Sequence, residues 1–324
     1  MSFRPSNIRR LGNRISVTIP TDPDGYVGRE CPESNCEGYF KVKPGTGLTG
    51  EHLPCVCPYC GHSAATDQFW TKDQVEYAKS VAFRKVTDAL HADLKSLEFN
   101  HRPKGPFGLG ISMTVKPGRP VLIRHYREKA LETHIACSGC TLQYAVFGLF
   151  AFCPDCGIHN SLQILERNLE LALKQVALAS GLNDADLARH LIEDALENCV
   201  SAFDGFGRET CRVRAGVSSD PVRCERVSFQ NLPRATKNLN ELFSVDLRAA
   251  INPADWGGAH LAFMKRHLIA HRSGVIDQAY VDETGGPSSL LGHRVAVTAE
   301  DVREVSDIVG RIGERLVALL PAPR

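Results

Sequence analysis

Eight of the twelve cysteines of this chain fall into two groups with the spacing of metal-binding turns. Two cysteines a few residues apart can turn both sulfurs toward one ion, and a second such pair across a hairpin closes a tetrahedral site of four sulfurs that suits Zn²⁺. The spacing therefore predicts two structural zinc ions, each in a small β module. The predicted ligands are Cys31, Cys36, Cys57 and Cys60 in the first group, and Cys137, Cys140, Cys153 and Cys156 in the second.

Both groups look like zinc ribbons. Each ends in the turn Cys-Pro-x-Cys-Gly, in which proline presets one backbone angle and glycine lets backbone amides approach a thiolate. In the first group the gap between Cys31 and Cys36 is longer, and Cys55 and His62 compete as ligands. Two alternatives stay open: buried thiols without a metal, and a catalytic zinc, which uses three protein ligands and leaves one position for water. Four cysteines close the site and favour a structural ion.

A second candidate site is the run Arg266-His267-Leu268-Ile269-Ala270-His271, near the end of a predicted helix. His267 and His271 are four residues apart and therefore share one helix face. Histidine, with an ordinary pKa of about 6.5, can donate or accept a proton near neutral pH, and arginine can hold a phosphate by paired hydrogen bonds. A purely structural explanation is also open, because cations near the C-terminal end of a helix are stabilised by its dipole.

This run resembles the Arg-x4-His signature of the HEPN superfamily of helical domains, and the resemblance covers residues 161–324. It implies a metal-independent endoribonuclease of a toxin–antitoxin, antiviral-defence or RNA-processing system, with a composite site built by two subunits. It also implies that His271 is the essential acid or base, that Arg266 binds phosphate and that His267 is an auxiliary polar residue. Ser273 stands where some HEPN toxins carry a tyrosine that a partner enzyme modifies, so that switch is not expected here.

The partners expected with this function are RNA, a second copy of the chain in a homodimer, and an antitoxin or other regulatory protein. The competing function is a non-catalytic module in which the ribbons and the helical domain bind nucleic acid or protein. A metallohydrolase is disfavoured, because the sequence has no His-Glu-x-x-His motif.

Periodicity predicts the elements that must position these residues. A capping box at residues 71–74 opens a long helix that should stop before Pro103, and two short strands are expected between Cys140 and Cys153. Further strands are expected at 111–115 and 121–124, beside the second ribbon. Beyond residue 161, about five helices joined by polar loops indicate an all-α bundle. These helices are expected from 161 to about 181, from 183 past 203, at 236–249, at 253–272 and from 298 onward, with a loop at 214–235.

The predicted fold class is a multidomain chain with two small β zinc ribbons and a C-terminal all-α, HEPN-like bundle. The expected parts are a first ribbon at 1–64, a connecting helix at 65–103, a β-rich segment with the second ribbon at 104–160, and the helical domain at 161–324.

Composition agrees with an enzyme or binding protein of two or three domains that stays in the cytoplasm. The chain has 324 residues, of which 43% are hydrophobic, and its 38 Lys+Arg nearly balance its 37 Asp+Glu. Its longest apolar run, 144–152, is far below the roughly 20 residues that a bilayer crossing needs, so no membrane association is expected. The first residues lack the apolar segment of a secretory signal, and cytoplasmic thiols stay reduced and free to bind metal.

Overall fold

The computed structural model divides the chain into two compact units. The first unit comprises residues 1–149 and 153–157, and the second comprises residues 150–152 and 158–324. The residues that the structure describes are 5–47, 54–101, 111–116, 118, 120–124, 126–131 and 133–322.

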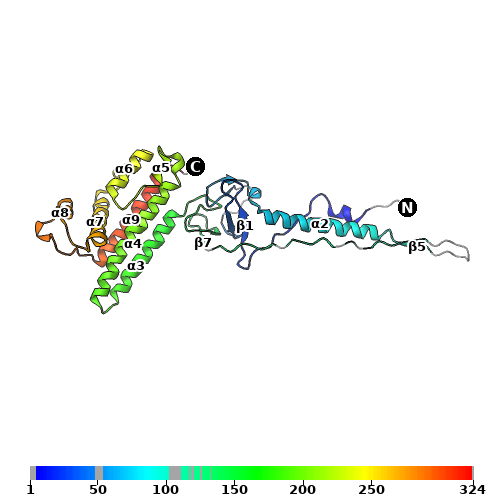
Figure 1. The fold of residues 1–324 in the computed structure, drawn as a ribbon, viewed down its shortest axis with the longest axis horizontal. Coiled ribbons are helices and arrows are strands. Elements are labelled where there is room, and N and C mark those ends of the chain that lie inside the picture. The colour runs from blue at the N-terminus through cyan, green and yellow to red at the C-terminus, as the bar shows by residue number, and fades with distance from the viewer. Residues whose placement is uncertain are drawn as a thin grey trace, which may run out of the picture. The chain divides into compact units, whose positions relative to one another are not determined.

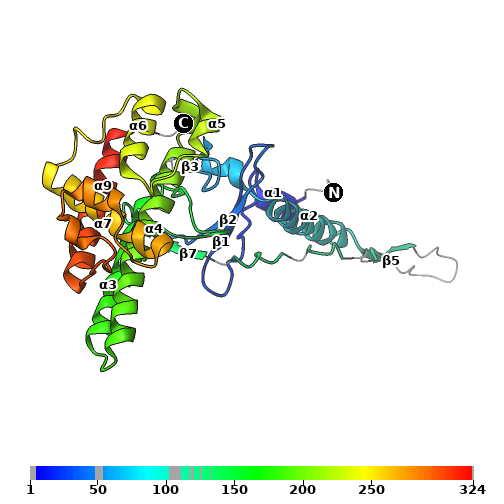
Figure 2. The same ribbon diagram turned by 60° about the vertical axis from the view of Figure 1, so that its left-hand side comes forward.

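The first unit is built on a four-stranded antiparallel sheet with the strand order β1-β2-β8-β7 (Figures 1 and 2). Its strands are β1 (Val27–Glu30), β2 (Tyr39–Val42), β7 (Thr133–Ala136) and β8 (Gln143–Val146). The β1–β2 hairpin belongs to the first cysteine group and the β7–β8 hairpin to the second. Pairing of β2 with β8, which sets Val42 opposite Tyr144, joins the hairpins. The two expected ribbons therefore share one sheet.

The strands of the second group differ from the expectation of two strands between Cys140 and Cys153. Only β8 lies between these cysteines, and its hairpin partner β7 precedes Cys137. Three consecutive β8 residues, from Tyr144 to Val146, are almost completely buried. A central strand covered on both faces is apolar at successive positions, so its pattern does not reveal its partners.

A smaller sheet completes the cysteine-rich part of this unit. It pairs β3 (Cys55–Val56) with β4 (Ser63–Ala64) and is followed by the 3₁₀ helix η1 (Thr66–Phe69). The Val56 N–H donates to the Pro154 carbonyl at 2.8 Å, which ties the first cysteine group to the second. Both groups thus rest on one continuous scaffold.

A long helix, α2 (Lys72–Lys95), begins where the sequence predicts it. Thr71 and Gln74 form both halves of the capping box. The residues that the helix buries are Gln74 and Asp93. The Asp93 carboxylate accepts the backbone N–H groups of residues 6, 7 and 8 at the start of α1 (Asn7–Leu11), at 2.9 to 3.1 Å. The carboxylate thereby takes up the free donors of the short helix and holds it beside α2.

The strands expected beside the second ribbon lie elsewhere. β6 (Ile111–Met113) forms a hairpin with β5 (Phe99–His101). Residues 121–124 form no strand; they belong to an extended segment that runs beside α2 (Figure 1). The Arg124 N–H donates to the Ser80 Oγ atom at 3.1 Å. This backbone donor is therefore bonded to a side chain of α2 and not to the carbonyl of a neighbouring strand.

The second unit is an all-α bundle, as predicted. Its longest helices are the hairpin pair α3 (Ser161–Ser180) and α4 (Ala185–Arg212), together with α7 (Pro253–Arg272) and α9 (Ala299–Leu319). Shorter elements connect them: η2 (Ala215–Val217), α5 (Pro221–Cys224), α6 (Leu232–Phe243), α8 (Gln278–Thr284) and η3 (Ser288–Leu290). The predicted bounds of α7 are confirmed at both ends, and so is the capping box of Thr298 and Asp301 at the start of α9.

Aromatic residues fill the centre of this bundle. Phe203 and Phe229 meet edge to face with ring centroids 5.8 Å apart, and Phe263 of α7 packs on Phe203 at 6.0 Å. Gly207 is required here, because a Cβ atom at this position would lie 2.4 Å from the Phe229 ring. The apolar faces of α3, α4, α7 and α9 therefore meet around one close-packed core.

The expected loop at 214–235 is the main error in the helical part. It contains η2 and α5, and the next helix is α6 at 232–243 rather than 236–249. Asp220 and Asn231 cap these helices by accepting backbone N–H groups three residues ahead, and prolines occupy their first turns. The N–H groups in the first turn of a helix have no partner within the helix, so prolines in this turn start helices rather than break them.

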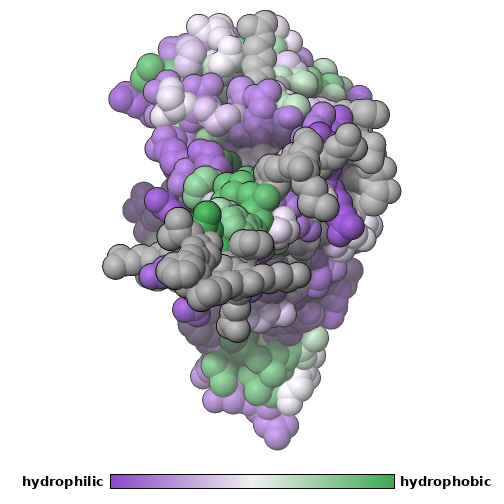
Figure 3. Space-filling model, turned by 90° about the vertical axis from the view of Figure 1, so that its right-hand side faces the viewer, coloured by the Kyte–Doolittle hydropathy of each residue, from purple (hydrophilic) through white to green (hydrophobic). Residues whose placement is uncertain are grey.

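Apolar side chains stay exposed on several elements, among them α2 and the α3–α4 hairpin. Val75, Phe83, Val86, Leu90 and Leu94 of α2 are between 37% and 60% exposed. In the second unit, hydrophobic residues gather where α3 meets α4, at the lower end of Figure 3. Exposed apolar patches are typical of surfaces that contact another molecule.

Candidate metal centres and candidate active site

The first cysteine group brings together four residues from two turns. The backbone N–H of Cys31 donates to the Gly38 carbonyl at 3.0 Å, and that of Cys57 donates to the His62 carbonyl at 2.8 Å, so each turn closes a short hairpin. The sulfur atoms of Cys31 and Cys60 lie 3.7 Å apart, as do those of Cys36 and Cys57. In each of these close pairs, one sulfur comes from the first turn and the other from the second, as a single ion shared by both turns requires.

The second group has the same construction. The sulfurs of Cys137 and Cys156 are 3.6 Å apart, and those of Cys140 and Cys153 are 3.5 Å apart. Gly157, which follows this group, has a φ of 72°, a backbone conformation that glycine adopts without strain. Its N–H donates to the Cys153 carbonyl at 3.0 Å and closes the turn.

Both groups fit a tetrahedral metal ion. All four sulfurs of each group lie within 4.8 Å of one another. A Zn–S bond of about 2.3 Å sets the sulfurs of a tetrahedron about 3.8 Å apart, close to the separations seen here. Each group could therefore hold a metal ion such as zinc. Cys55 and His62, the competing ligands of the first group, lie outside the cluster.

The surroundings raise the pKa of some of these cysteine thiols and lower the pKa of another. Burial raises the pKa of Cys31 and of Cys140 to about 12. At Cys137 burial has the same effect, but the backbone N–H groups of Cys140 and Gly139 donate to the sulfur and bring its pKa below the ordinary value. A bound cation would stabilise the thiolate at every ligand, because metal binding displaces the thiol proton.

Tyr59 connects the two groups through the shared sheet. Tyr59 stands between the ligands Cys57 and Cys60 in the sequence, and its hydroxyl donates to the Tyr39 carbonyl at 2.6 Å. The same hydroxyl accepts the N–H of Phe147, at the end of β8, at 3.0 Å. A Cβ atom on Gly38 would lie 2.3 Å from the Tyr59 ring, so this position has no room for a side chain.

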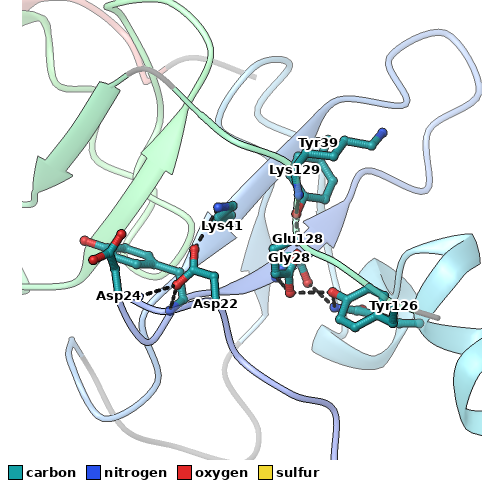
Figure 4. Close-up of polar contacts among 10 residues, drawn as sticks. Asp22, Asp24, Gly28, Tyr39, Lys41, Tyr126, Glu128 and Lys129 are labelled. Carbon is teal, nitrogen blue, oxygen red and sulfur yellow. Dashed lines mark hydrogen bonds and ion pairs between the residues drawn. The ribbon is translucent and has the colours of Figure 1, made fainter.

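Two polar networks, one of them partly buried, support the β1–β2 hairpin, and the sequence predicted neither (Figure 4). The Glu128 carboxylate accepts the hydroxyls of Tyr39 and Tyr126 and the backbone N–H of Gly28 at 2.6 Å. On another part of the hairpin, Lys41 and Asp22 form an ion pair of 2.7 Å. Glu128 lies 100 residues beyond Gly28, and no local pattern could have linked them.

The proposed catalytic residues lie on the last turns of α7 but do not form one cluster. His267 and His271 are both exposed, and their ring centroids are 4.9 Å apart. Arg266 continues the face of α7 that buries Ala259 and Phe263. Its Nε atom is buried and has no hydrogen-bond partner among the described residues. Arg266 and His271 are five residues apart, which turns them about 140° from each other around the helix.

Neighbouring cations of α7 have acidic partners. Lys265 pairs with Asp301 at 2.8 Å, and Arg272 lies 3.8 Å from Asp277. In the part of the chain that the structure describes, no carboxylate forms an ion pair with Arg266, His267 or His271. These three side chains therefore lack, in the described chain, the carboxylate partners that Lys265 and Arg272 have.

Another histidine, His159, belongs to a buried network that stabilises the fold. Its Nε2 atom lies 3.3 Å from Glu209, which also receives two hydrogen bonds of 2.6 Å from Arg212. The Ser161 N–H donates to the other ring nitrogen at 3.3 Å, so the ring proton faces Glu209. Burial acts to raise the pKa of Glu209, but Arg212 and His159 outweigh it and lower that pKa to about 2. The network fastens residues 158–161 to α4.

The helices of the described chain include none with the length and apolar character to cross a bilayer. Comparison with family models, curated proteins and solved structures found no match to this chain.

Proposed function

We propose that this chain is a zinc-stabilised endoribonuclease of HEPN type, acting in toxin, phage-defence or RNA-processing systems, and that its reaction needs no catalytic metal. The observation that carries the proposal is the end of α7. There, a buried guanidinium nitrogen of Arg266 has no acceptor among the described residues, close in sequence to two exposed histidines. Leaving a buried charged donor unpaired is costly, and a phosphate oxygen would satisfy it.

The proposed role of the cysteine groups is structural. Four sulfur ligands leave no open position for a water or substrate, and this donor set favours zinc among the abundant divalent ions. The ions would stabilise the fold of the first unit, and this unit would assist in binding the substrate or a partner. The proton transfers of the reaction then fall to the histidines.

The chemistry follows from the side chains of α7. The 2′-hydroxyl of RNA attacks the adjacent phosphorus, forming one P–O bond while the bond to the 5′-oxygen breaks. A base must take the proton of the 2′-hydroxyl, and an acid must give one to the departing 5′-oxygen. We assign His271 to one of these tasks, His267 to an auxiliary role, and Arg266 to the charge that develops on the phosphate. The products would be a 2′,3′-cyclic phosphate and a 5′-hydroxyl.

A homodimer would allow Arg266 and His271 to act on the same phosphate. Because Arg266 and His271 point about 140° apart on one helix, a single α7 does not direct both at one phosphate. A two-fold axis beside the end of α7 would bring the arginine of one copy toward the histidine of the other. Mixing Arg266→Ala with His271→Ala subunits tests this arrangement: mixed dimers should regain part of the activity, whereas sites confined to one chain would leave the mixture inactive.

Cleavage of a labelled single-stranded RNA, with products resolved on a gel, tests the function. His271→Ala and Arg266→Ala should each abolish cleavage without changing the thermal unfolding of the second unit. His190→Ala is the matched control, because His190 is an exposed histidine of the same unit that lies 3.7 Å from Asp194. Activity should survive a chelator too weak to remove the cysteine-bound ions. If both α7 variants cut as fast as the parent, the proposal is wrong.

A non-catalytic binding module is the second candidate, and one observation favours it. Neither His267 nor His271 has a carboxylate within ion-pair distance in the described chain, whereas His159 and His260, the latter on the same helix, each do. An unoriented imidazole is a weaker general base than one held in place by a partner. A purified dimer that binds RNA tightly and leaves it intact would support this function.

A further inference from the structure

The first unit contains a cavity of about 220 Å³ between the two cysteine groups. Its walls come from the end of β2 and the loop after it, from Arg29 of β1, from Cys55 of β3 and from the turn at Pro154. The hydrogen bond from Val56 to Pro154 and one of 3.0 Å from the Gln143 N–H to Thr46 fix these walls to one another. The cavity is smaller than the roughly 300 to 1,000 Å³ of sites for drug-sized ligands.

Two cations line this cavity, and neither forms an ion pair with a carboxylate in the described chain. Arg29 uses one of its five N–H donors on the Gly28 carbonyl at 2.8 Å and stacks on Trp70 at 4.6 Å. Lys43 lies 5.5 Å from the centre of the Tyr26 ring. The contrast with Lys41, two residues earlier and paired with Asp22 at 2.7 Å, shows that this unit supplies carboxylates to cations elsewhere.

The remaining walls suit a flat ring. Three prolines line the cavity, Pro44, Pro54 and Pro154, together with Val42 and Leu142. The threonines 46 and 66 and the carboxylate of Asp155 add polar groups. Cations without an ion-paired carboxylate, beside apolar walls and a few polar groups, are the combination that a nucleotide needs: its phosphate pairs with the cations, and its base lies against apolar surface.

We infer that this cavity binds one nucleotide, with the phosphate on Arg29 and Lys43 and the base against the proline walls. The nucleotide in the cavity is either a free nucleotide or one residue of a single-stranded RNA. The assignment to RNA rests on the proposed function, whereas the phosphate site itself does not. The competing role of the two cations is to balance the negative charge of metal-bound thiolates.

Equilibrium binding tests the inference on the full-length chain carrying His271→Ala, which keeps RNA intact. Two probes are used: AMP by calorimetry, and a fluorescein-labelled ten-residue oligouridylate by anisotropy. Arg29→Gln with Lys43→Gln should weaken binding about tenfold or more, as expected for lost charge-assisted hydrogen bonds. For the oligomer, each lost phosphate contact should lower the slope of log affinity against log salt by about 0.7.

The matched control is Lys72→Gln with Lys79→Gln, which removes the same charge from two cations of this unit that already pair with glutamates. Lys43→Gln alone serves as a milder variant that leaves Arg29 on Trp70. Weaker binding of both probes identifies a site open to free nucleotides, and weaker binding of the oligomer alone identifies a site for RNA. Unchanged binding of both overturns the inference, as does a loss of bound metal equal to the loss of affinity. Because the assay needs no cleavage, its result is independent of whether α7 is catalytic.

Discussion

Replacing Cys140 with alanine tests whether the second cysteine group holds the shared sheet together. Cys140 lies three residues before β8, which makes four register pairs with β7 and two with β2. With one sulfur ligand fewer, the ion holds the turn that fixes the start of β8 less firmly, and both pairings weaken. The β1–β2 hairpin keeps its own register pairs and its own cysteine group.

The expected size of the effect follows from the donor set. A structural zinc ion contributes about 10 to 16 kcal/mol, and one of four ligands carries on the order of a quarter of this, about 3 kcal/mol. One of the buried apolar clusters of the first unit consists of only Tyr39, Leu131 and Ala145, whereas the core of the second unit draws on four long helices. A loss of about 3 kcal/mol makes local opening about 100-fold more frequent.

Hydrogen exchange followed by mass spectrometry measures this opening in each segment, and native mass spectrometry counts the bound ions. Amides of β7 and β8 should exchange about 100-fold faster in Cys140→Ala, while those of α4 and α9 keep their protection. Cys55→Ala is the control, because Cys55 is a buried thiol of the same unit outside the metal cluster. Parent-like protection of β7 and β8 in Cys140→Ala would refute the reasoning.

Three further predictions concern the second unit. Gly207→Ala should lower its stability by about 1 to 3 kcal/mol in chemical denaturation, because the added Cβ lies 2.4 Å from Phe229; an unchanged midpoint would contradict the packing described. The lowered pKa of Glu209 stabilises the fold above its ordinary value of 4.5, and this stabilisation is lost as the pH falls toward 2. Glu209→Gln should therefore cost about 1 to 2 kcal/mol at pH 7, after allowance for water around the half-exposed Arg212, and clearly less at pH 3; an equal cost at both would speak against the network. Thr298→Ala should remove about 1 kcal/mol by deleting the cap of α9, with Thr298→Ser restoring most of it; equal stability of all three proteins would exclude the cap.

Local signals in the sequence predicted much of this fold. The capping boxes at Thr71 and Thr298 mark the starts of α2 and α9, because such caps use side chains within three residues of the helix end. The cysteine spacing predicted the two groups for the same reason, since each turn is closed by its own backbone. Helix α7 is bounded by a proline at its start and by Ser273 and Gly274 with positive φ at its end, and both signals are local.

Features that depend on distant residues were not predicted. The β2–β8 pairing joins residues about 100 positions apart, and nothing in either strand specifies the other. The same limit applies to Glu128 and Gly28. At the candidate active site, spacing alone gives the 140° between Arg266 and His271, but the buried Nε of Arg266 depends on how α7 packs.

The central claim is that this chain cuts RNA through the end of α7. The most direct measurement is the single-turnover cleavage rate of the purified parent and of His271→Ala on one labelled RNA, with the product ends identified. The account predicts 2′,3′-cyclic phosphate and 5′-hydroxyl ends from the parent and a rate at least about 100-fold lower in the variant, the usual loss on removal of a general acid or base. Equal rates, or an RNA that the parent binds and leaves whole, would contradict it.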